Sequence, residues 1–217
     1  MTIDLSRPLS IAHFHGDIEI DDLSSSEWNK AETVSVTKYW SGETAPAGRH
    51  FTARLLWSDK YIYARFDASQ AEPLVVAQEP DLTQKTIGLW DRDVCEIFLA
   101  PNADEPRRYF EFEVAPTGEW IDLFIDSTSG TRRTDAEYIS KLESFASIEK
   151  GSIAMALKIP WTALGTKPSP GDMWLGNLFR CVGRDSDRGY LAYNPTLTHA
   201  PSFHVPERFV EIRFKNE

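Results

Sequence analysis

Three glutamates and a tryptophan occur in two segments that otherwise have the composition of buried strands. Trp90 and Glu96 lie in the segment GLWDRDVCEIFL, and Glu111 and Glu113 lie in the segment RYFEFEV. Carboxylates in such places need water, a cation or hydroxyl donors as partners. An aromatic ring beside them offers an apolar plate. Together these residue types could hold a ligand that has apolar faces and a rim of hydroxyl groups.

Alternation along these two segments predicts which side chains share a face of a sheet. The set expected to point into the core is Cys95, Ile97, Leu99, Phe110, Phe112 and Val114. The set expected on the outer face is Val94, Glu96, Phe98, Tyr109, Glu111 and Glu113. Two neighbouring strands would then present their acids on one face.

Period-two alternation recurs along the chain and predicts an all-β fold. Residues 51–66 have the pattern of a hairpin with a short polar turn at 58–60. The further strands expected cover residues 94–99, 108–114, 120–125, 152–159, 174–182 and 209–214. Turn sequences such as Pro116-Thr117-Gly118 separate them. Many short strands with regular breaks indicate an antiparallel β-sandwich or jelly roll.

Helical signal is weak. Residues 159–165 fit one turn that Pro160 enters and Gly165 leaves, and we expect one or two such turns. The polar segment 125–150 is expected to be a loop that contains a short helix or an edge strand. Because neither a repeat nor a linker is visible, residues 1–217 are predicted to form a single domain.

Charge and hydropathy argue against two classes of partner. The net charge of −10, from 33 acids and 23 bases, is unsuited to following a phosphate backbone, so nucleic acid is not expected. No run of 18 apolar residues occurs, and the start MTIDLSRP lacks an apolar signal region, so we expect no membrane partner. The chain as written would stay in the cytoplasm, whereas a removed export signal would place it outside. The oligomeric state stays open.

Cysteines and histidines give no strong metal motif. Cys95 and Cys181 lie in strand-like patterns without CxxC spacing and are interpreted as small buried hydrophobes, with a disulfide as the alternative. His13 and His15 have no third ligand nearby in the sequence, so a metal site there is not expected.

Four blocks of the sequence, in order, resemble the carbohydrate-binding module family 9 and its relatives. The blocks are LWDRDVCEIFL, YFEFEVAPTGEWID, KIPWTALGTKPSPGDMWLGNLFR, and AYNPT followed by SFHVPERFVEIRF. They cover most of the chain. The resemblance implies a β-sandwich that holds a sugar in a slot between two aromatic rings, at the ends of glucan or xylan chains or as mono- and disaccharides.

Carried over position by position, the resemblance implies a set of ligand-binding residues. Trp90 and Phe203, the latter where the family has Trp, are expected to supply the two rings. The polar contacts are expected from Glu96, Glu111, Glu113, Asn177 and Arg180, with Glu113 standing where the family has a basic residue. Trp57, Trp120, Trp161 and Trp174 are assigned to the core, and His204 and Arg208 to bracing the last loop. No cofactor is expected to be required. The resemblance makes structural calcium a reasonable addition, because the relatives hold such ions near the N-terminal strands, and this chain has acids there at Asp17, Glu19, Asp21 and Asp22.

The expected function is non-catalytic binding of an oligo- or polysaccharide, as in modules that accompany glycanases in xylan and cellulose breakdown. The first alternative is a glycoside hydrolase that uses a pair of these carboxylates. The second is a structural or partner-binding sandwich whose slot is filled by its own loop. A haem-binding relative is a third, but Met1, Met155 and Met173 offer no convincing pair of axial ligands.

Overall fold

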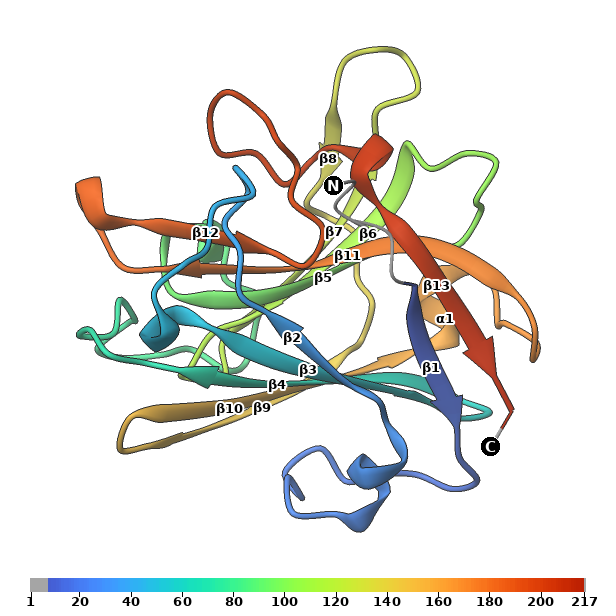
Figure 1. The fold of residues 1–217 in the computed structure, drawn as a ribbon. Helices are drawn as coiled ribbons and strands as arrows, with labels where there is room; N and C mark the ends of the chain where they lie inside the picture. The colour runs from blue at the N-terminus through green and yellow to red at the C-terminus, as the bar shows by residue number, and fades with distance from the viewer. Residues whose placement is uncertain (1–7, 217) are drawn as a thin grey trace.

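The computed structural model describes residues 8–216, and most of its regular structure is β-strand (Figure 1). The strands are β1 (Leu9–His13), β2 (Thr33–Val36), β3 (Phe51–Trp57), β4 (Tyr61–Ser69), β5 (Val94–Ala100), β6 (Arg108–Val114), β7 (Trp120–Asp126), β8 (Arg133–Asp135), β9 (Glu143–Glu149), β10 (Ser152–Pro160), β11 (Met173–Val182), β12 (Gly189–Ala192) and β13 (Val210–Lys215). The short helical turns are α1 (Trp161–Leu164) and the 3-10 turns η1 (Ser26–Lys30), η2 (Ala47–Arg49), η3 (Leu89–Asp91), η4 (Asp185–Asp187) and η5 (Pro206–Arg208). These turns outnumber the one or two expected, but none is long.

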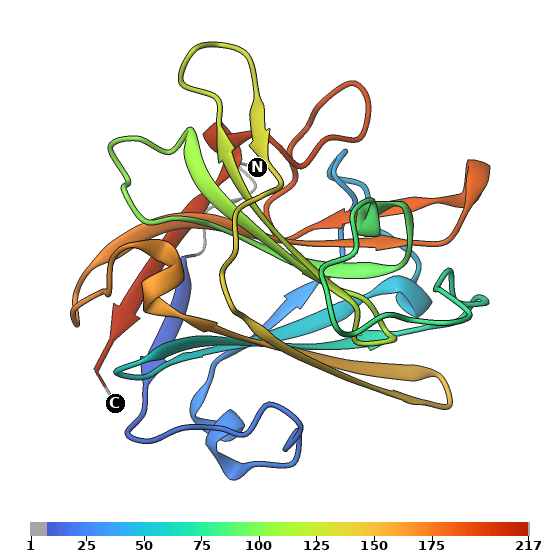
Figure 2. The same cartoon turned by 180° about the vertical axis from the view of Figure 1, so that it is seen from behind.

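The strands form one curled sheet that folds over into two layers. Hydrogen bonds connect the strands in the order β8-β7-β6-β5-β11-β13-β1-β3-β4-β10-β9, with β12 added to β11 and β2 to β3. In Figure 1 the layer that contains β5, β6 and β11 lies above the layer that contains β3, β4 and β10. β1 pairs in parallel with both β13 and β3 and so joins the layers, while the other pairs are antiparallel. Figure 2 shows the same two layers from behind. The predicted β-sandwich is confirmed.

Buried apolar side chains from both layers fill the space between them. Ile97 and Leu178 from one layer and Leu157 from the other are fully buried in this core. Each such side chain contributes about 1.5–3 kcal/mol to folding. The tryptophans assigned to the core occupy it as predicted: Trp57, Trp161 and Trp174 are buried, and Trp120 is partly buried against it.

The alternation predicted for β5 and β6 is confirmed. The side chains in the core are Cys95, Ile97, Leu99, Phe112 and Val114, with Phe110 partly buried against them. On the outer face, Glu96 stands opposite Glu113 and Phe98 stands opposite Glu111 in the β5–β6 register. This pairing brings the three acids together.

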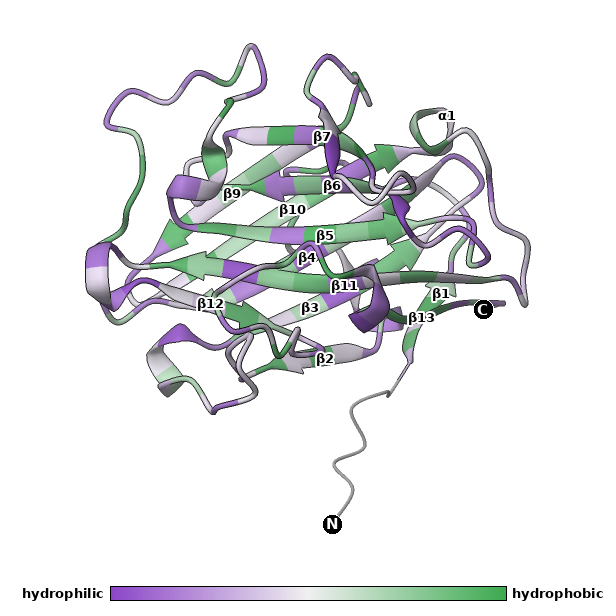
Figure 3. Ribbon diagram, turned by 90° about the horizontal axis from the view of Figure 1, so that it is seen from above, coloured by the Kyte–Doolittle hydropathy of each residue, from purple (hydrophilic) through white to green (hydrophobic). Residues whose placement is uncertain are grey.

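The outer face is not the solvated surface that this alternation alone suggests. A second apolar cluster covers it, in which Phe98, Tyr109 and Phe179 of the strands pack with Phe203 and Phe209 of the loops. Figure 3 looks onto this side and shows hydrophilic residues within the mostly hydrophobic strands β5 and β6. The acids are therefore buried under loops.

The structure also tests the predictions for the short helical turn, the polar segment 125–150 and the two cysteines. The single turn α1 lies between Pro160 and Gly165, as predicted, and Gly165 has a φ of 69°. The segment 125–150 contains the strands β8 and β9 and no helix, so the edge-strand alternative is confirmed. Cys95 and Cys181 are buried free thiols on opposite faces of the sheet.

Two further findings concern the chain as a whole. No helix among residues 8–216 is both long and apolar enough to cross a bilayer. Met1, considered above as an axial ligand, lies outside the described residues.

Gly176 allows β5 and β13 to approach β11 from both sides. A Cβ atom at this position would meet the carbonyl oxygen of Phe98 and lie 2.6 Å from Cδ1 of Ile212. We expect Gly176→Ala to lower the free energy of unfolding by about 1–3 kcal/mol, because a packed backbone cannot move away. Urea denaturation measures this change. Ser35→Ala, on an exposed site of the edge strand β2, should stay within about 0.5 kcal/mol of the parent chain. Equal stability of all three proteins would contradict the described register.

Candidate functional site

A pocket of about 510 Å³ opens on the outer face of the layer that contains β5, β6 and β11. Its lining from the strands is Glu96, Phe98, Glu111, Leu123, Thr134, Cys181 and Tyr190. Its lining from turns and loops is Trp90, Asp91, Arg132, Arg188, Pro201, Ser202, Phe203 and His204. The strands thus supply a fixed base, while the loops supply the walls.

A larger hollow of about 660 Å³ lies on the other layer, beside β4 and β10. Two of its charged side chains are already paired, since Arg65 donates hydrogen bonds to both oxygens of Asp67. The pocket on β5 and β6 is the better candidate, because it combines aromatic rings with buried acids that have no donors.

Trp90 stands on a short turn held from both sides. Gly88 adopts the left-handed conformation with a φ of 81°, and the neighbouring Leu89 is fully buried. The Arg188 guanidinium donates hydrogen bonds to the carbonyl oxygens of Trp90, Arg92 and Gly183. The indole itself is 39% exposed and lines the pocket. The turn therefore exposes the indole ring of Trp90 to the pocket.

Further rings line the pocket. Phe203 is mostly buried and stacks on Phe179, with ring centroids 4.2 Å apart and planes 13° apart. One face of Phe203 is thus occupied within the protein. Tyr190 lies edge-on to Phe203, and the Arg188 guanidinium lies 5.5 Å from the centre of its ring. Phe203 remains the predicted second ring, and Tyr190 is an additional aromatic wall.

Three carboxyl groups converge at the base of the pocket. Each of Glu96, Glu111 and Glu113 offers an oxygen, and these atoms all lie within 4.8 Å of one another. All three residues are at least 97% buried. Both oxygens of Glu113 and one of Glu111 have no hydrogen-bond partner, whereas Glu96 accepts a weak bond from the Cys181 thiol at 3.4 Å. Such groups are costly to ionise.

Burial and mutual repulsion shift the pKa values of these acids upward. Burial raises the pKa of Glu111 to about 7. Burial also raises the pKa values of Glu96 and Glu113 well above the ordinary value, and the neighbouring carboxylates raise them further. Near neutral pH the base of the pocket therefore retains protons and can both donate and accept hydrogen bonds.

His204 lines the wall next to these acids. Its Nδ1 atom lies 2.9 Å from the Tyr109 hydroxyl and 3.9 Å from a Glu111 oxygen. Burial lowers the pKa of His204 to about 3, and the charge of Arg132 lowers it further. The imidazole is thus neutral at ordinary pH and does not form an ion pair with Glu111.

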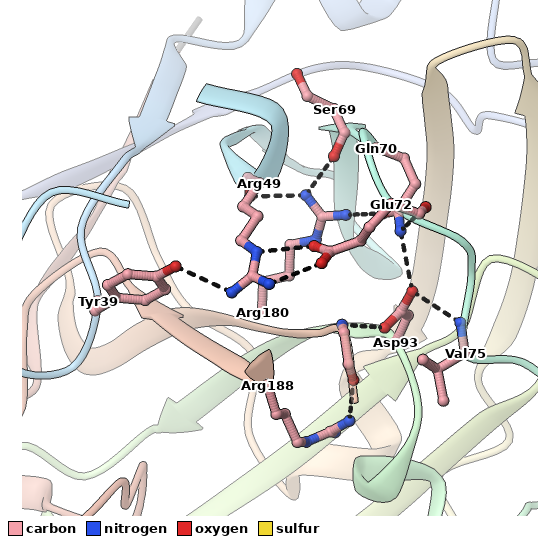
Figure 4. A network of polar contacts seen from close by, with 10 residues as sticks. Tyr39, Arg49, Ser69, Gln70, Glu72, Val75, Asp93, Arg180 and Arg188 are labelled. Carbon is pink, nitrogen blue, oxygen red and sulfur yellow. Dashed lines mark hydrogen bonds and ion pairs between the residues drawn. The ribbon is translucent and has the colours of Figure 1, made fainter. Parts of the chain in front are cut away.

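Asn177 and Arg180, which the resemblance assigned to ligand contacts, do not line the pocket. The Asn177 side chain donates to the Asn194 carbonyl at 2.9 Å and accepts the Asn194 backbone N–H at 3.0 Å. Arg180 points to the opposite face of β11 and donates to the carbonyl oxygens of Arg49 and Ser69 and to the Gln70 side chain (Figure 4). Both residues tie loops to the sheet.

A second group of possible metal ligands contains His13 and His15. Asp59 lies with His13 and His15, so the fold provides the third ligand atom that the sequence did not reveal. The Lys167 ammonium pairs with Asp59 at 2.6 Å.

The N-terminal acids considered for calcium form no comparable group among residues 8–216. Asp17 accepts a hydrogen bond from the Tyr63 hydroxyl at 2.6 Å and pairs with Lys158 at 2.9 Å. Calcium at these acids stays a prediction.

Sequence analysis missed four residues of the pocket wall: Arg132, Arg188, Tyr190 and His204. The segment that contains Arg132 had no strand pattern, and His204 was assigned only to bracing a loop. The alternation in GYLA, now strand β12, was the one available signal for Tyr190.

Folding stability should fall as the pH rises through about 7. A carboxyl group with a raised pKa in the fold binds more protons there than in the unfolded chain, so its stabilisation is lost as the pH rises. The loss from Glu111 spans about pH 4.5 to 7, and Glu96 and Glu113, whose pKa values burial raises, act in the same direction. His204 acts in the opposite direction, but only below about pH 6.5.

We therefore expect the free energy of unfolding to fall by about 1–3 kcal/mol between about pH 6 and pH 8, measured by urea denaturation. Glu113→Gln should reduce this fall, because the amide cannot ionise. The exposed Glu137→Gln should retain the parent slope. A flat profile in the parent chain would show that these acids are not desolvated.

Two known enzymes each contain a segment that is similar in sequence to this chain. The chain is 23% identical over 163 residues to Exoglucanase XynX of Acetivibrio thermocellus and 25% identical over 170 residues to Endo-1,4-beta-xylanase A of Thermoanaerobacterium saccharolyticum. These matches cover 75% and 78% of the chain, but only 13% of each enzyme.

A solved structure and a family match complete the comparison. A carbohydrate binding module family 9 from Caldicellulosiruptor kristjanssonii, in complex with cellotriose, superimposes with a TM-score of 0.69. The superposition covers 97% of this chain and 95% of that one at 17% identity, which shows a shared fold. Residues 20–189 match the family described as carbohydrate family 9 binding domain-like, and the chain therefore belongs to that family.

Proposed function

We propose that the pocket binds carbohydrate without catalysing a reaction, and that its ligand is the end of a glucan or xylan chain or a related mono- or disaccharide. The observation that carries this proposal is the exposed indole of Trp90 beside a base of carboxyl groups. The comparisons support it, because the matched enzymes are an exoglucanase and a xylanase and the solved module holds cellotriose.

The lining of the pocket suits both the apolar faces and the hydroxyl rim of a pyranose. The indole of Trp90 would remove water from one C–H face of the ring, while Tyr190 or the free part of Phe203 bounds the other side. The carboxyl groups of Glu96 and Glu111 would pair with hydroxyl groups at the rim. Because their raised pKa values leave them partly protonated, they can accept and donate hydrogen bonds.

A pocket of this kind should bind with modest affinity. The contacts with one exposed aromatic ring and a few polar groups must offset the entropy that a flexible sugar loses when it binds. A Kd in the micromolar to millimolar range, about −8 to −4 kcal/mol, is expected.

The arrangement of the acids favours binding over hydrolysis. A glycosidase places its two carboxyl groups on either side of the scissile bond, about 5 Å or more apart. Here Glu96, Glu111 and Glu113 lie side by side on one base, and their offered oxygens are within 4.8 Å of one another. Incubation with xylan and cello-oligosaccharides should release no new reducing ends. Product that disappears in Glu96→Gln would support the hydrolase alternative instead.

The open pocket also favours a small ligand over the other alternative, a structural or partner-binding sandwich whose slot is filled by its own loop. In the part of the chain described, the loops line a space of about 510 Å³ and leave Trp90 39% exposed.

Trp90→Ala should weaken cellotriose binding by about 2 kcal/mol or more, because it removes the central aromatic contact. Isothermal titration calorimetry measures the change, and quenching of indole fluorescence provides a second readout. Ile139→Ala is the control, because Ile139 is exposed and does not line the pocket. The proposal fails if cellotriose, glucose and xylobiose give no heat with the parent chain, or if Trp90→Ala binds them equally well.

Arg188→Lys tests whether the guanidinium positions the Trp90 turn. Lysine keeps the charge but cannot donate to three carbonyl oxygens in a fixed geometry. We expect cellotriose binding to weaken several-fold, measured by the same titration. Arg184→Lys, an exposed change in the same loop, should bind like the parent chain. Equal affinities in the two variants would show that the turn does not depend on Arg188.

A further inference from the structure

We propose that Glu96, Glu111 and Glu113 form a site for a single hard divalent cation of the calcium class at the base of the pocket. This inference shares Glu96 and Glu111 with the proposed sugar contacts, but it rests on the arrangement of the acids rather than on the aromatic rings above them. It also differs from the calcium expected near the N-terminal strands, which involves other acids.

The first observation is the convergence of the ligand atoms. Oxygens of three carboxyl groups lie within 4.8 Å of one another. In a calcium shell the oxygens lie about 2.4 Å from the ion, so oxygens of one shell are separated by no more than about 4.8 Å. Carboxylate oxygens are the ligands that calcium, magnesium and manganese prefer.

The second observation is that, apart from one another and the Cys181 thiol, these acids have no hydrogen-bond partner that satisfies them. Glu113 is fully buried, and neither of its oxygens accepts a hydrogen bond. One oxygen of Glu111 is also without a partner, although that residue is 97% buried and lines the pocket. Buried polar atoms are satisfied in most proteins, so unsatisfied oxygens directed at one point indicate a ligand.

Among the residues that the structure describes, no basic side chain forms an ion pair with these glutamates, although Arg132 and Arg188 line the same pocket. Most other buried acids of the chain already have a basic or backbone partner. Asp122 pairs with Lys85, Glu119 pairs with Arg92, and Asp93 accepts backbone N–H groups of Val75 and Gly183. Around the three glutamates, no lysine or arginine comes within ion-pair distance among residues 8–216, and His204 is neutral.

The depth of the site favours a single ion over an ammonium group on a sugar. Glu113 stands opposite Glu96 on the neighbouring strand, is fully buried, and is not among the residues that line the pocket. A bare ion is small enough to contact all three residues, whereas an amine fixed to a pyranose would contact only Glu96 and Glu111, which line the pocket. The open coordination positions of the ion would face the pocket and be filled by water.

The test is a titration of metal-free protein with calcium chloride at about pH 8, followed by calorimetry and by the thermal midpoint. We expect one calcium ion per chain and a rise in Tm. Glu113→Gln should lower the affinity at least tenfold and remove the rise in Tm. The same variant should unfold at a higher temperature than the parent chain without calcium, because a buried charge is lost, and this shows that it folds. Glu137→Gln, which alters an exposed acid outside both acidic groups, should leave calcium binding unchanged.

Several results would overturn this inference. It is wrong if neither calcium, magnesium nor manganese binds, or if Glu113→Gln and Glu111→Gln bind calcium as tightly as the parent chain. It is also wrong if glucosamine binds in a Glu113-dependent manner while the metal ions do not. A cellotriose titration in the presence of a chelator distinguishes failure of this inference from failure of the proposed function. If cellotriose binds without calcium, a negative calcium titration overturns only the metal site.

Discussion

The burial of three carboxyl groups on the outer face of β5 and β6 is the constraint on which the site depends. A sheet face that carries Glu96, Glu111 and Glu113 would ordinarily face water. Here loops pack on the aromatic residues around these acids and exclude water from them. The cost of desolvation must be offset by protons, by a cation or by a ligand with hydroxyl groups. The same cluster therefore gives the pocket its polarity.

The rest of the fold keeps this acidic base and its walls in place. Arg180 joins β11 to the backbone of the opposite layer, and Asn177 joins it to the loop that follows β12. Arg188 holds the turn that presents Trp90. These bonds to backbone carbonyls fix loops that would otherwise be mobile, so the aromatic wall stands at a defined distance from the base. A rigid scaffold that positions a few loops is a common way to build a binding site.

Much of the fold could be predicted from the sequence, because period-two alternation reports directly on strands and on the faces of their side chains. The inward set on β5 and β6 and the core tryptophans followed from it. The burial of Glu96 could not be predicted in this way, since alternation gives the face of a residue but not what covers that face. His204 enters the pocket through a loop conformation that no local pattern encodes, and Tyr190 lies on the short strand β12, whose four residues gave only a weak signal. Asn177 and Arg180 were expected at the ligand from resemblance alone, while their hydrogen bonds to distant backbone appear only in the folded chain.

The central claim is that a sugar ring lies against Trp90 above the acidic base, and the indole N–H signals test it most directly. The chain has seven tryptophans, and two of the buried ones, Trp57 and Trp161, donate their indole N–H groups to the carbonyl oxygens of Lys215 and Ser58. In a proton–nitrogen correlation spectrum of labelled protein titrated with cellotriose, the account predicts a large shift of the Trp90 signal and little movement of these two. A saturable titration in which the Trp90 signal does not move would contradict it.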